Sequence, residues 1–183
     1  MAPSITIRDL ELFLPREQIH RRIDQIGTAI NRDFQGQSLL LLGVLKGAAM
    51  FLSDLARAIT LDSTFDFVSV SSYGASSRSS GTVRLVKDAD QPLENRIVIL
   101  VEDIVDTGVT LRYLKNHLLA QRPAALKIVT LLDKPSRRLQ AIEPDYIGFT
   151  VPNRFVVGYG MDLAERFRNL PDIYFVPPNI QEE

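Results

Sequence analysis

The sequence predicts an α/β fold in which a mostly parallel central sheet is flanked by helices. Nearly continuous apolar runs of strand length alternate along the chain with segments whose apolar residues recur at helical spacing. Strands that are apolar on both faces are typical of parallel sheets that helices bury from each side. The 183 residues suffice for a sizeable core, and we expect residues 1–183 to form a single domain.

The N-terminal half begins with a helix and then alternates strand and helix. Pro15 suits the first turn of the first helix. The residues that mark its apolar face are Ile19, Ile23, Ile26, Ile30 and Phe34. Residues 38–44 form a continuous apolar run that predicts a buried strand. A helix over residues 47–59 and a strand over residues 65–72 are expected next.

The C-terminal half begins with a segment of a different kind. Residues 72–82 are small and polar without apolar periodicity, which predicts a mobile loop over about residues 72–84. The strands expected after it cover residues 83–88, 96–102, 125–133, 146–151, 154–160 and 173–176. The helix after the second of these strands has its buried face at Leu111, Leu114, Leu118 and Leu119.

The composition excludes several classes of function. The 22 acidic and 21 basic side chains nearly cancel, which argues against a general nucleic-acid or membrane-surface binder. The chain has no cysteine, so disulfides, thiolate catalysis and cysteine-ligated zinc are excluded. Residues 1–15 do not resemble a signal peptide, and no apolar run reaches the roughly 18–20 residues of a membrane span. We therefore expect a cytoplasmic protein without a membrane partner.

An acidic cluster follows the strand over residues 96–102. Glu102 and Asp103 are expected at the exit of this strand, where neither side chain need enter the core. The segment 106–110, Asp-Thr-Gly-Val-Thr, then offers backbone N–H groups, two hydroxyls and a helix N-terminus, which together suit an anion. A ribose 5-phosphate would satisfy all these groups. The simpler alternative is that Asp106 caps the helix and that the other two acids are solvated.

Other polar residues also fall at the ends of expected strands, namely Lys46 and Gly47 after one strand and Asp133 and Lys134 after another. In open α/β sheets, ligands bind at the carboxyl ends of the strands. The pattern alone therefore predicts that these residues converge with the acidic cluster on one site.

The string from Glu102 to Leu111, E-D-I-V-D-T-G-V-T-L, resembles the 5-phosphoribosyl pyrophosphate (PRPP) signature of the type I phosphoribosyltransferases. Its three acids resemble the hypoxanthine-guanine branch of that family, which acts in purine salvage. The resemblance covers roughly residues 5–176. It implies the type I phosphoribosyltransferase fold, with a small hood over the C-terminal strand ends that the N-terminal and C-terminal segments build.

Within the signature, the resemblance implies a role for each polar residue. Asp106 would be the general base. The backbone and hydroxyl groups of Asp106, Thr107, Gly108 and Thr110 would hold the 5′-phosphate of PRPP. Glu102 and Asp103 would hold the ribose hydroxyls, or a magnesium ion through its water molecules.

The pyrophosphate would meet residues 43–57, which resemble the pyrophosphate loop of the family. In that loop a cis peptide bond, here between Leu45 and Lys46, turns backbone N–H groups toward pyrophosphate, and Gly47 follows it. Arg168 would contact pyrophosphate from the C-terminal segment. Taken alone, the first segment would be an ordinary strand-to-helix turn with a solvated lysine.

Residues 71–88 resemble the loop that closes over the site during the reaction, and Ser72 and Tyr73 match the Ser-Tyr pair of that loop. Closure would shield a cation-like transition state from water. The simpler alternative is a surface loop without a role.

The purine would meet residues that follow the later strands. Residues 131–138 resemble the segment whose lysine contacts the six-position oxygen of the base; here that lysine is Lys134, and Arg138 would support the segment. A donor at this position favours oxopurines over adenine. Phe155 would stack on the purine, and the backbone of Val156 would meet its edge. Without this context, the lysine would be solvated and the phenylalanine would be a core residue.

One motif departs from the family pattern. Asp162, the residue expected to bind magnesium, begins the string Asp-Leu-Ala-Glu, where the family commonly has Asp-Tyr-Asn-Glu. Because Asp162 itself is present, the expected role in binding magnesium stands. The change at Leu163 and Ala164 leaves the ranking of guanine, hypoxanthine and xanthine open.

The implied reaction joins hypoxanthine or guanine to the phosphoribosyl group of PRPP, giving IMP or GMP and pyrophosphate, with Mg²⁺ as cofactor. Members of the family are usually dimeric or tetrameric, so we expect a homodimer or homotetramer. Two alternatives are a regulator that binds PRPP or nucleotide together with RNA or DNA, and a phospho-acceptor signalling domain. The presence of Asp106 and the balanced charge favour the enzyme over the regulator. The phosphate-binding segment 106–110 favours it over the signalling domain.

Overall fold

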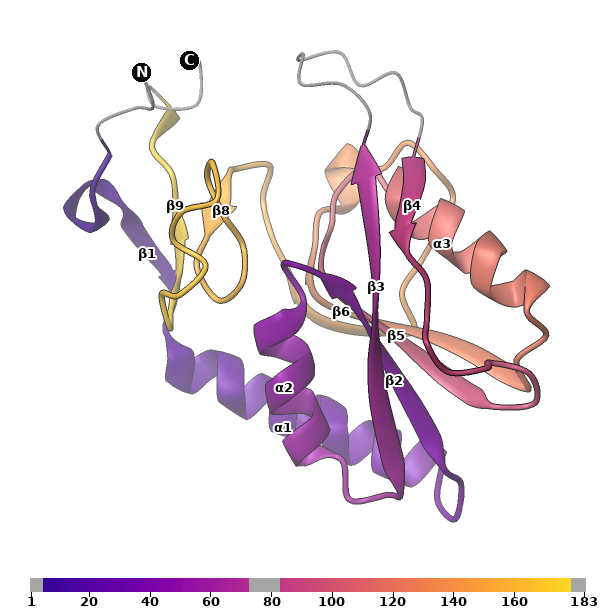
Figure 1. The fold of residues 1–183 in the computed structure, drawn as a ribbon. Helices are drawn as coiled ribbons and strands as arrows, with labels where there is room; N and C mark the ends of the chain where they lie inside the picture. Colours follow the sequence, from indigo (N-terminus) through magenta and orange to yellow (C-terminus); the bar gives the residue numbers. More distant parts are fainter. Residues whose placement is uncertain (1–4, 73–82, 179–183) are drawn as a thin grey trace.

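A computed structural model describes residues 5–72 and 83–178. The strands of its central sheet are β2 (Leu39–Leu45), β3 (Ser63–Ser72), β4 (Val83–Lys87), β5 (Ile97–Val105), β6 (Ala125–Asp133) and β7 (Tyr146–Thr150). Their order in the sheet is β4-β3-β2-β5-β6-β7 (Figure 1). Every neighbouring pair is parallel except β3 and β4. The structure confirms the α/β fold with a mostly parallel central sheet.

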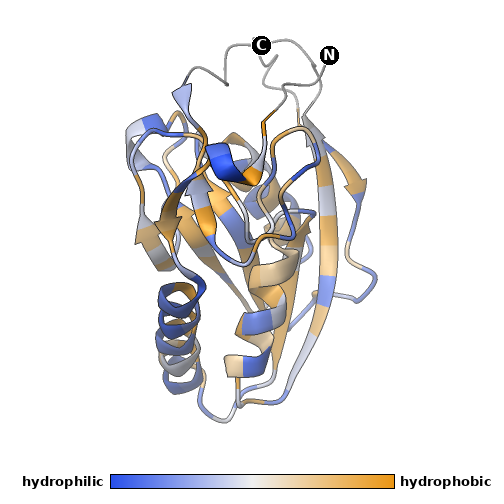
Figure 2. Ribbon diagram, turned by 90° about the vertical axis from the view of Figure 1, so that its left-hand side faces the viewer, coloured by the Kyte–Doolittle hydropathy of each residue, from blue (hydrophilic) through white to orange (hydrophobic). Residues whose placement is uncertain are grey.

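Helices cover both faces of this sheet. They are α1 (Arg16–Asp33), α2 (Ala49–Ala58) and α3 (Val109–Ala120). Side chains alternate between the faces of a strand, so Leu39 and Leu41 of β2 share a core with α1 and α2. Leu40 and Leu42 pack with α3 on the other face. Figure 2 shows hydrophobic residues concentrated on the strands, whereas the helices carry hydrophilic as well as hydrophobic residues. Within the described ranges, no helix has the length and apolar character needed to cross a membrane.

Strand β5 corrects one expectation about the acidic cluster. It runs on to Val105, which pairs with Asp133 of β6, so Glu102 and Asp103 lie inside the strand. Glu102 is only 8% exposed. The expectation that neither acid would enter the core was therefore wrong for Glu102. The reason is that the parallel ladder with β6 continues beyond the apolar run.

A smaller antiparallel sheet forms the hood. Its strands, in spatial order, are β1 (Glu11–Leu14), β9 (Ile173–Phe175) and β8 (Val156–Val157). In Figure 1 it stands beside the central sheet, above α1. The hood thus joins N-terminal and C-terminal segments, as the resemblance implies. Strand β1 was not predicted, because four residues are too few to show a period.

Two expected segments differ in extent or are only partly described. The strand expected over residues 154–160 shrinks to the two residues of β8, since Gly158 and Gly160 take φ values of 97° and 99° and turn the chain. Most of the loop expected at about residues 72–84, including Tyr73, lies outside the described residues. Two short 3₁₀ helices complete the fold, η1 (Ile7–Asp9) and η2 (Pro135–Arg137).

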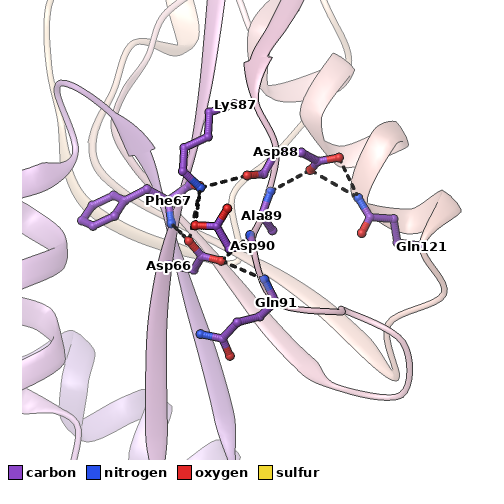
Figure 3. A network of polar contacts seen from close by, with 8 residues as sticks. All are labelled: Asp66, Phe67, Lys87, Asp88, Ala89, Asp90, Gln91 and Gln121. Carbon is purple, nitrogen blue, oxygen red and sulfur yellow. Dashed lines mark hydrogen bonds and ion pairs between the residues drawn. The ribbon is translucent and has the colours of Figure 1, made fainter.

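A buried carboxylate ties β3 to the connection between β4 and β5. Asp66 is 7% exposed and accepts hydrogen bonds from the backbone N–H groups of Phe67, Asp90 and Gln91, at 2.6, 2.7 and 3.1 Å (Figure 3). The Lys87 ammonium lies 3.5 Å from the same carboxylate. Burial disfavours the ionised form of Asp66, but these four donors together lower its pKa below the ordinary value.

The lowered pKa of Asp66 predicts a pH-dependent contribution to stability. Such a group stabilises the fold above its unfolded-state pKa of about 3.9, and the stabilisation is lost as the pH falls through the folded-state pKa. We expect Asp66→Asn to reduce the free energy of unfolding by about 1–3 kcal/mol at pH 7, and by less at pH 3. Urea denaturation at both pH values measures the two differences.

The control is Asp24→Asn, at an exposed position of α1, which should change the free energy of unfolding by less than about 0.5 kcal/mol. A loss in Asp66→Asn that is the same at pH 7 and pH 3 would contradict the assigned role of the carboxylate.

Candidate active site

Two carboxyl groups lie at the carboxyl end of β5. Asp103 packs against Gly47, so closely that a Cβ on this glycine would stand 1.8 Å from Oδ2 of the aspartate. Its Oδ1 accepts a hydrogen bond from the N–H of Ile104 at 2.8 Å. Burial raises the pKa of Glu102 well above its usual range, and the neighbouring Asp103 adds to this; burial also raises the pKa of Asp103. The pair therefore suits a partner that brings hydroxyl donors or positive charge.

A small cavity lies where β5 passes into α3, with a volume of about 140 Å³. The residues that line it are Glu102, Ile104, Val105, Asp106, Thr107, Gly108, Thr110 and Leu111. Gly108 has a φ of 80°, and a Cβ there would stand 2.8 Å from Cγ2 of Ile142. The N–H groups of the first helical turn have no partner within α3, so this cavity can accept an anion. The structure thus brings the residues predicted to hold a 5′-phosphate into one cavity.

Two arginines that follow β6 contact Asp106 at the start of the segment 106–110. Arg137 Nε lies 3.0 Å from Oδ1 of Asp106. Arg138 donates to the backbone carbonyl of Asp106 at 2.7 Å and forms an ion pair with Asp133. Sequence reasoning gave Arg138 a supporting place and missed Arg137. The signal was available, because both arginines follow Lys134 closely at the end of a strand that neighbours β5.

Of the residues expected to meet a purine, Lys134 lies near enough to Asp106 to feel its charge. Lys134 is 6% exposed, and burial lowers its pKa while the charge of Asp106 opposes the shift. Phe155 is 40% exposed, so its ring is not part of the core. Val156 is buried, and its place in β8 opposite Phe175 fixes the backbone beside this ring. An ammonium donor, an open aromatic ring and a fixed backbone are the elements that a planar heterocycle requires.

The tip of the hood meets the segment after β2. The peptide bond between Leu45 and Lys46 is cis, as the resemblance implies. Lys46 Nζ lies 2.8 Å from one carboxylate oxygen of Glu165, and Arg168 Nη2 lies 3.3 Å from the other. The hydrogen bond from Lys46 lowers the pKa of Glu165. The structure therefore brings together the two cations expected to meet pyrophosphate, through an acid to which the sequence assigned no role.

Asp162, the acid expected to bind magnesium, is engaged within the hood. Its Oδ1 lies 2.8 Å from Arg168, and its Oδ2 accepts the N–H of Glu165 at 2.8 Å. Among the residues that the structure describes, no cluster of three or more His, Cys, Asp or Glu side chains could hold a metal ion. The donors do fit Mg²⁺, since this ion takes oxygen ligands and fills several positions with water and substrate oxygens. Such an ion would bind here together with a phosphorylated substrate.

Comparison with known proteins places this geometry in a family. The family model described as the phosphoribosyl transferase domain matches residues 13–164. The chain is 44% identical over 175 residues to the hypoxanthine-guanine phosphoribosyltransferase of Bacillus subtilis, which covers 95% of this chain and 97% of that protein. The chain belongs to the hypoxanthine-guanine phosphoribosyltransferase family.

Two further members of the hypoxanthine-guanine phosphoribosyltransferase family are similar to this chain. A crystal structure of a hypoxanthine phosphoribosyltransferase from Staphylococcus aureus is similar with a TM-score of 0.92 and 40% identity, over 99% of this chain and 100% of that one. A Listeria innocua protein named bifunctional protein TilS/HprT is 44% identical over 173 residues, or 94% of this chain. The chain spans only 27% of that relative's length, so this match is confined to one part of the longer protein.

The contact between Gly47 and Asp103 predicts a large cost for the smallest possible side chain. We expect Gly47→Ala to lower the free energy of unfolding by about 2–3 kcal/mol, because the added methyl group would overlap a buried carboxylate whose other oxygen is already bound. Urea denaturation measures the loss.

The matched control is Gly36→Ala, at a glycine with open space around its Cβ position and a φ of 78°. This change should cost only about 1 kcal/mol, from backbone strain alone. Equal losses in the two variants would contradict the close packing of Asp103 against Gly47.

Proposed function

We propose that this chain is a purine-salvage transferase that moves the 5-phosphoribosyl group of PRPP to hypoxanthine or guanine, giving IMP or GMP and pyrophosphate. The observation that carries the proposal is the position of Asp106. It borders the anion cavity at the start of α3, and its charge acts on the buried Lys134. A carboxylate placed between a phosphate site and a purine site suits the transfer of a phosphorylated sugar to a base.

The two ends of PRPP would bind to different segments. The 5′-phosphate would accept hydrogen bonds from the N–H and hydroxyl groups of Thr107, Gly108 and Thr110. The ribose hydroxyls would donate to Glu102 and Asp103, which accept hydrogen bonds when ionised. The raised pKa of both acids is consistent with a partner that supplies protons or positive charge.

The pyrophosphate group would lie between the segment after β2 and the hood. The backbone of Leu45, Lys46 and Gly47 and the side chains of Lys46 and Arg168 would face it. Asp162, with Glu102 and Asp103 on the other side, would hold Mg²⁺, which when bound neutralises the negative charge of the leaving group. Two fixed cations near the same oxygens stabilise that charge further.

The purine would stack on Phe155, meet the backbone of Val156 and accept a hydrogen bond from Lys134 at its six-position oxygen. The amino group of adenine cannot accept that bond, so oxopurines are favoured. Lys134 is well placed to discriminate because its burial removes competing water.

In the reaction, N9 of the base would form a bond to the anomeric carbon as the bond from that carbon to the pyrophosphate oxygen breaks. The electron pair leaves with pyrophosphate, and the proton on N7 passes to Asp106. The Arg137 guanidinium, with its Nε 3.0 Å from Oδ1 of Asp106, would hold the carboxylate in place for this transfer. Closure of the loop at about residues 72–84, with Ser72 and Tyr73, would exclude water from the cation-like sugar.

We also propose that the chain works in the cytoplasm as a homodimer or homotetramer. The subunit number rests on the resemblance to a family whose members are usually dimeric or tetrameric, and the location is the one expected for an enzyme of purine salvage. Light scattering on the purified chain gives the number of subunits.

The test of the proposed function is nucleotide formation from PRPP and Mg²⁺ with each of hypoxanthine, guanine, xanthine and adenine. We expect turnover with hypoxanthine and guanine and none with adenine, because only oxopurines accept a hydrogen bond from Lys134. Turnover with xanthine alone would reassign the base. If no base is turned over while PRPP still binds, the proposed transferase activity is wrong, and a regulator that uses the same fold is favoured.

The role of Asp106 has its own test. We expect Asp106→Asn to lower kcat by about 10²–10⁴-fold, since an amide cannot take the N7 proton. The free energy of unfolding should change by less than about 1 kcal/mol, since the side chain is partly exposed and its ion pair with Arg137 lies at the surface. Wild-type turnover in this folded variant would remove Asp106 from the mechanism, and the exposed Asp24→Asn is the control.

A further inference from the structure

The hood carries a tight turn that presents Glu165 to the segment after β2. Leu163 and Arg166 exchange backbone hydrogen bonds of 3.2 and 3.1 Å. Ala164 and Glu165 lie between them with φ values of 50° and 64°, and positive φ at both central residues is the geometry of a type I′ turn. The N–H of Glu165 also donates to Asp162 at 2.8 Å. The backbone of Glu165 is therefore fixed at the tip of the hood.

The side chain of Glu165 joins the two cations assigned to pyrophosphate. One carboxylate oxygen lies 2.8 Å from Lys46 Nζ, and the other lies 3.3 Å from Arg168 Nη2. Arg168 is held in place by two further contacts, from its Nη2 to Oδ1 of Asp162 and from its Nη1 to the carbonyl of Gly160, both at 2.8 Å. The Glu165 side chain is 66% exposed, so it can rotate away from both cations without disturbing the core.

We propose that Glu165 is an intramolecular competitor for pyrophosphate, whose carboxylate bridges Lys46 and Arg168 until a pyrophosphate group replaces it. This inference rests on the proposed function, which assigns both cations to pyrophosphate. A carboxylate and a pyrophosphate offer anionic oxygens to the same N–H donors, so the ammonium of Lys46 cannot serve both fully. Glu165 thereby weakens the binding of PRPP and of product pyrophosphate, and it accelerates the release of the product.

The effect is expected to be modest, because the ion pair is exposed. The side chains of Lys46 and Glu165 are 65% and 66% exposed, and ion pairs of this kind contribute little free energy. Loss of the carboxylate should therefore tighten pyrophosphate binding by about two- to fivefold rather than by orders of magnitude.

The experiment is calorimetric titration of pyrophosphate, in the presence of Mg²⁺, into the wild type, Glu165→Gln and Glu165→Asp. We expect Glu165→Gln to lower the Kd for pyrophosphate by about two- to fivefold. The Kd of Glu165→Asp should lie between those of the wild type and Glu165→Gln, because the shorter side chain keeps its charge but lies farther from Lys46. The control is Glu94→Gln, which removes a carboxylate paired with Arg122 at 2.7 Å in the connection between β4 and β5, and which should bind pyrophosphate as the wild type does.

A second background separates competition for a cation from general repulsion. In the Lys46→Met variant the Glu165 carboxylate has lost its main partner. In that background, adding Glu165→Gln should therefore raise the affinity for pyrophosphate by less than about twofold. In steady state, Glu165→Gln should lower the KM for PRPP, whereas a purely structural role would lower kcat or stability without tightening any ligand.

Equal or weaker pyrophosphate binding by Glu165→Gln would overturn the inference. An undiminished gain in the Lys46→Met background would also overturn it, because the effect would then be long-range repulsion. The binding measurements do not depend on turnover. If the wild type forms nucleotide but Glu165→Gln binds pyrophosphate no more tightly, the inference fails and the proposed function stands. If no base is converted, the proposed function fails.

Discussion

The candidate site depends on the close approach of three chain segments at the carboxyl end of the central sheet. The Asp103 carboxylate occupies the space that a side chain at Gly47 would fill, and the carbonyl of Gly47 lies where a side chain at Gly160 would begin. Since Lys46 precedes Gly47 and Asp162 closely follows Gly160, this packing sets the separation between the loop after β2 and the hood. A side chain at either glycine would push the two halves of the site apart.

Around this contact, several of the charged groups are already paired with one another. Asp106 lies against Arg137, and Lys46 contacts Glu165. Arg168 contacts both Asp162 and Glu165. A ligand that enters such a site exchanges partners rather than finding free charges, so its affinity is the difference between two sets of interactions. Under the proposed function, the protein would fix the donors in advance, and the substrate would replace acceptors that the protein supplies.

The parts that sequence reasoning could predict are those whose signal is local. The strand β6 has the bounds expected from its apolar run, and four residues of the segment 106–110 line one cavity. The cis peptide bond and the hood were expected only from the resemblance to a family, because no periodicity in the sequence could indicate them. The burial of Glu102 was missed, because it depends on β5 continuing beside β6 beyond its own apolar run, as far as Val105. Glu165 was missed because it acts through Lys46, 119 residues away in the chain. Arg137, by contrast, could have been proposed from its position just after Lys134.

The sequence by itself determined the fold class, the two faces of the sheet and the position of the segment that is proposed to bind an anion. Apolar periodicity and turn chemistry are properties of neighbouring residues, so they can be read along the chain. Only the tertiary structure decided which cation each acid meets and which carboxylates lose their water. Those outcomes depend on distances of 2.8–3.3 Å between side chains from separate elements, such as Lys46, Glu165 and Arg168. Such distances are set when the sheet, the helices and the hood pack together, and no local pattern encodes them.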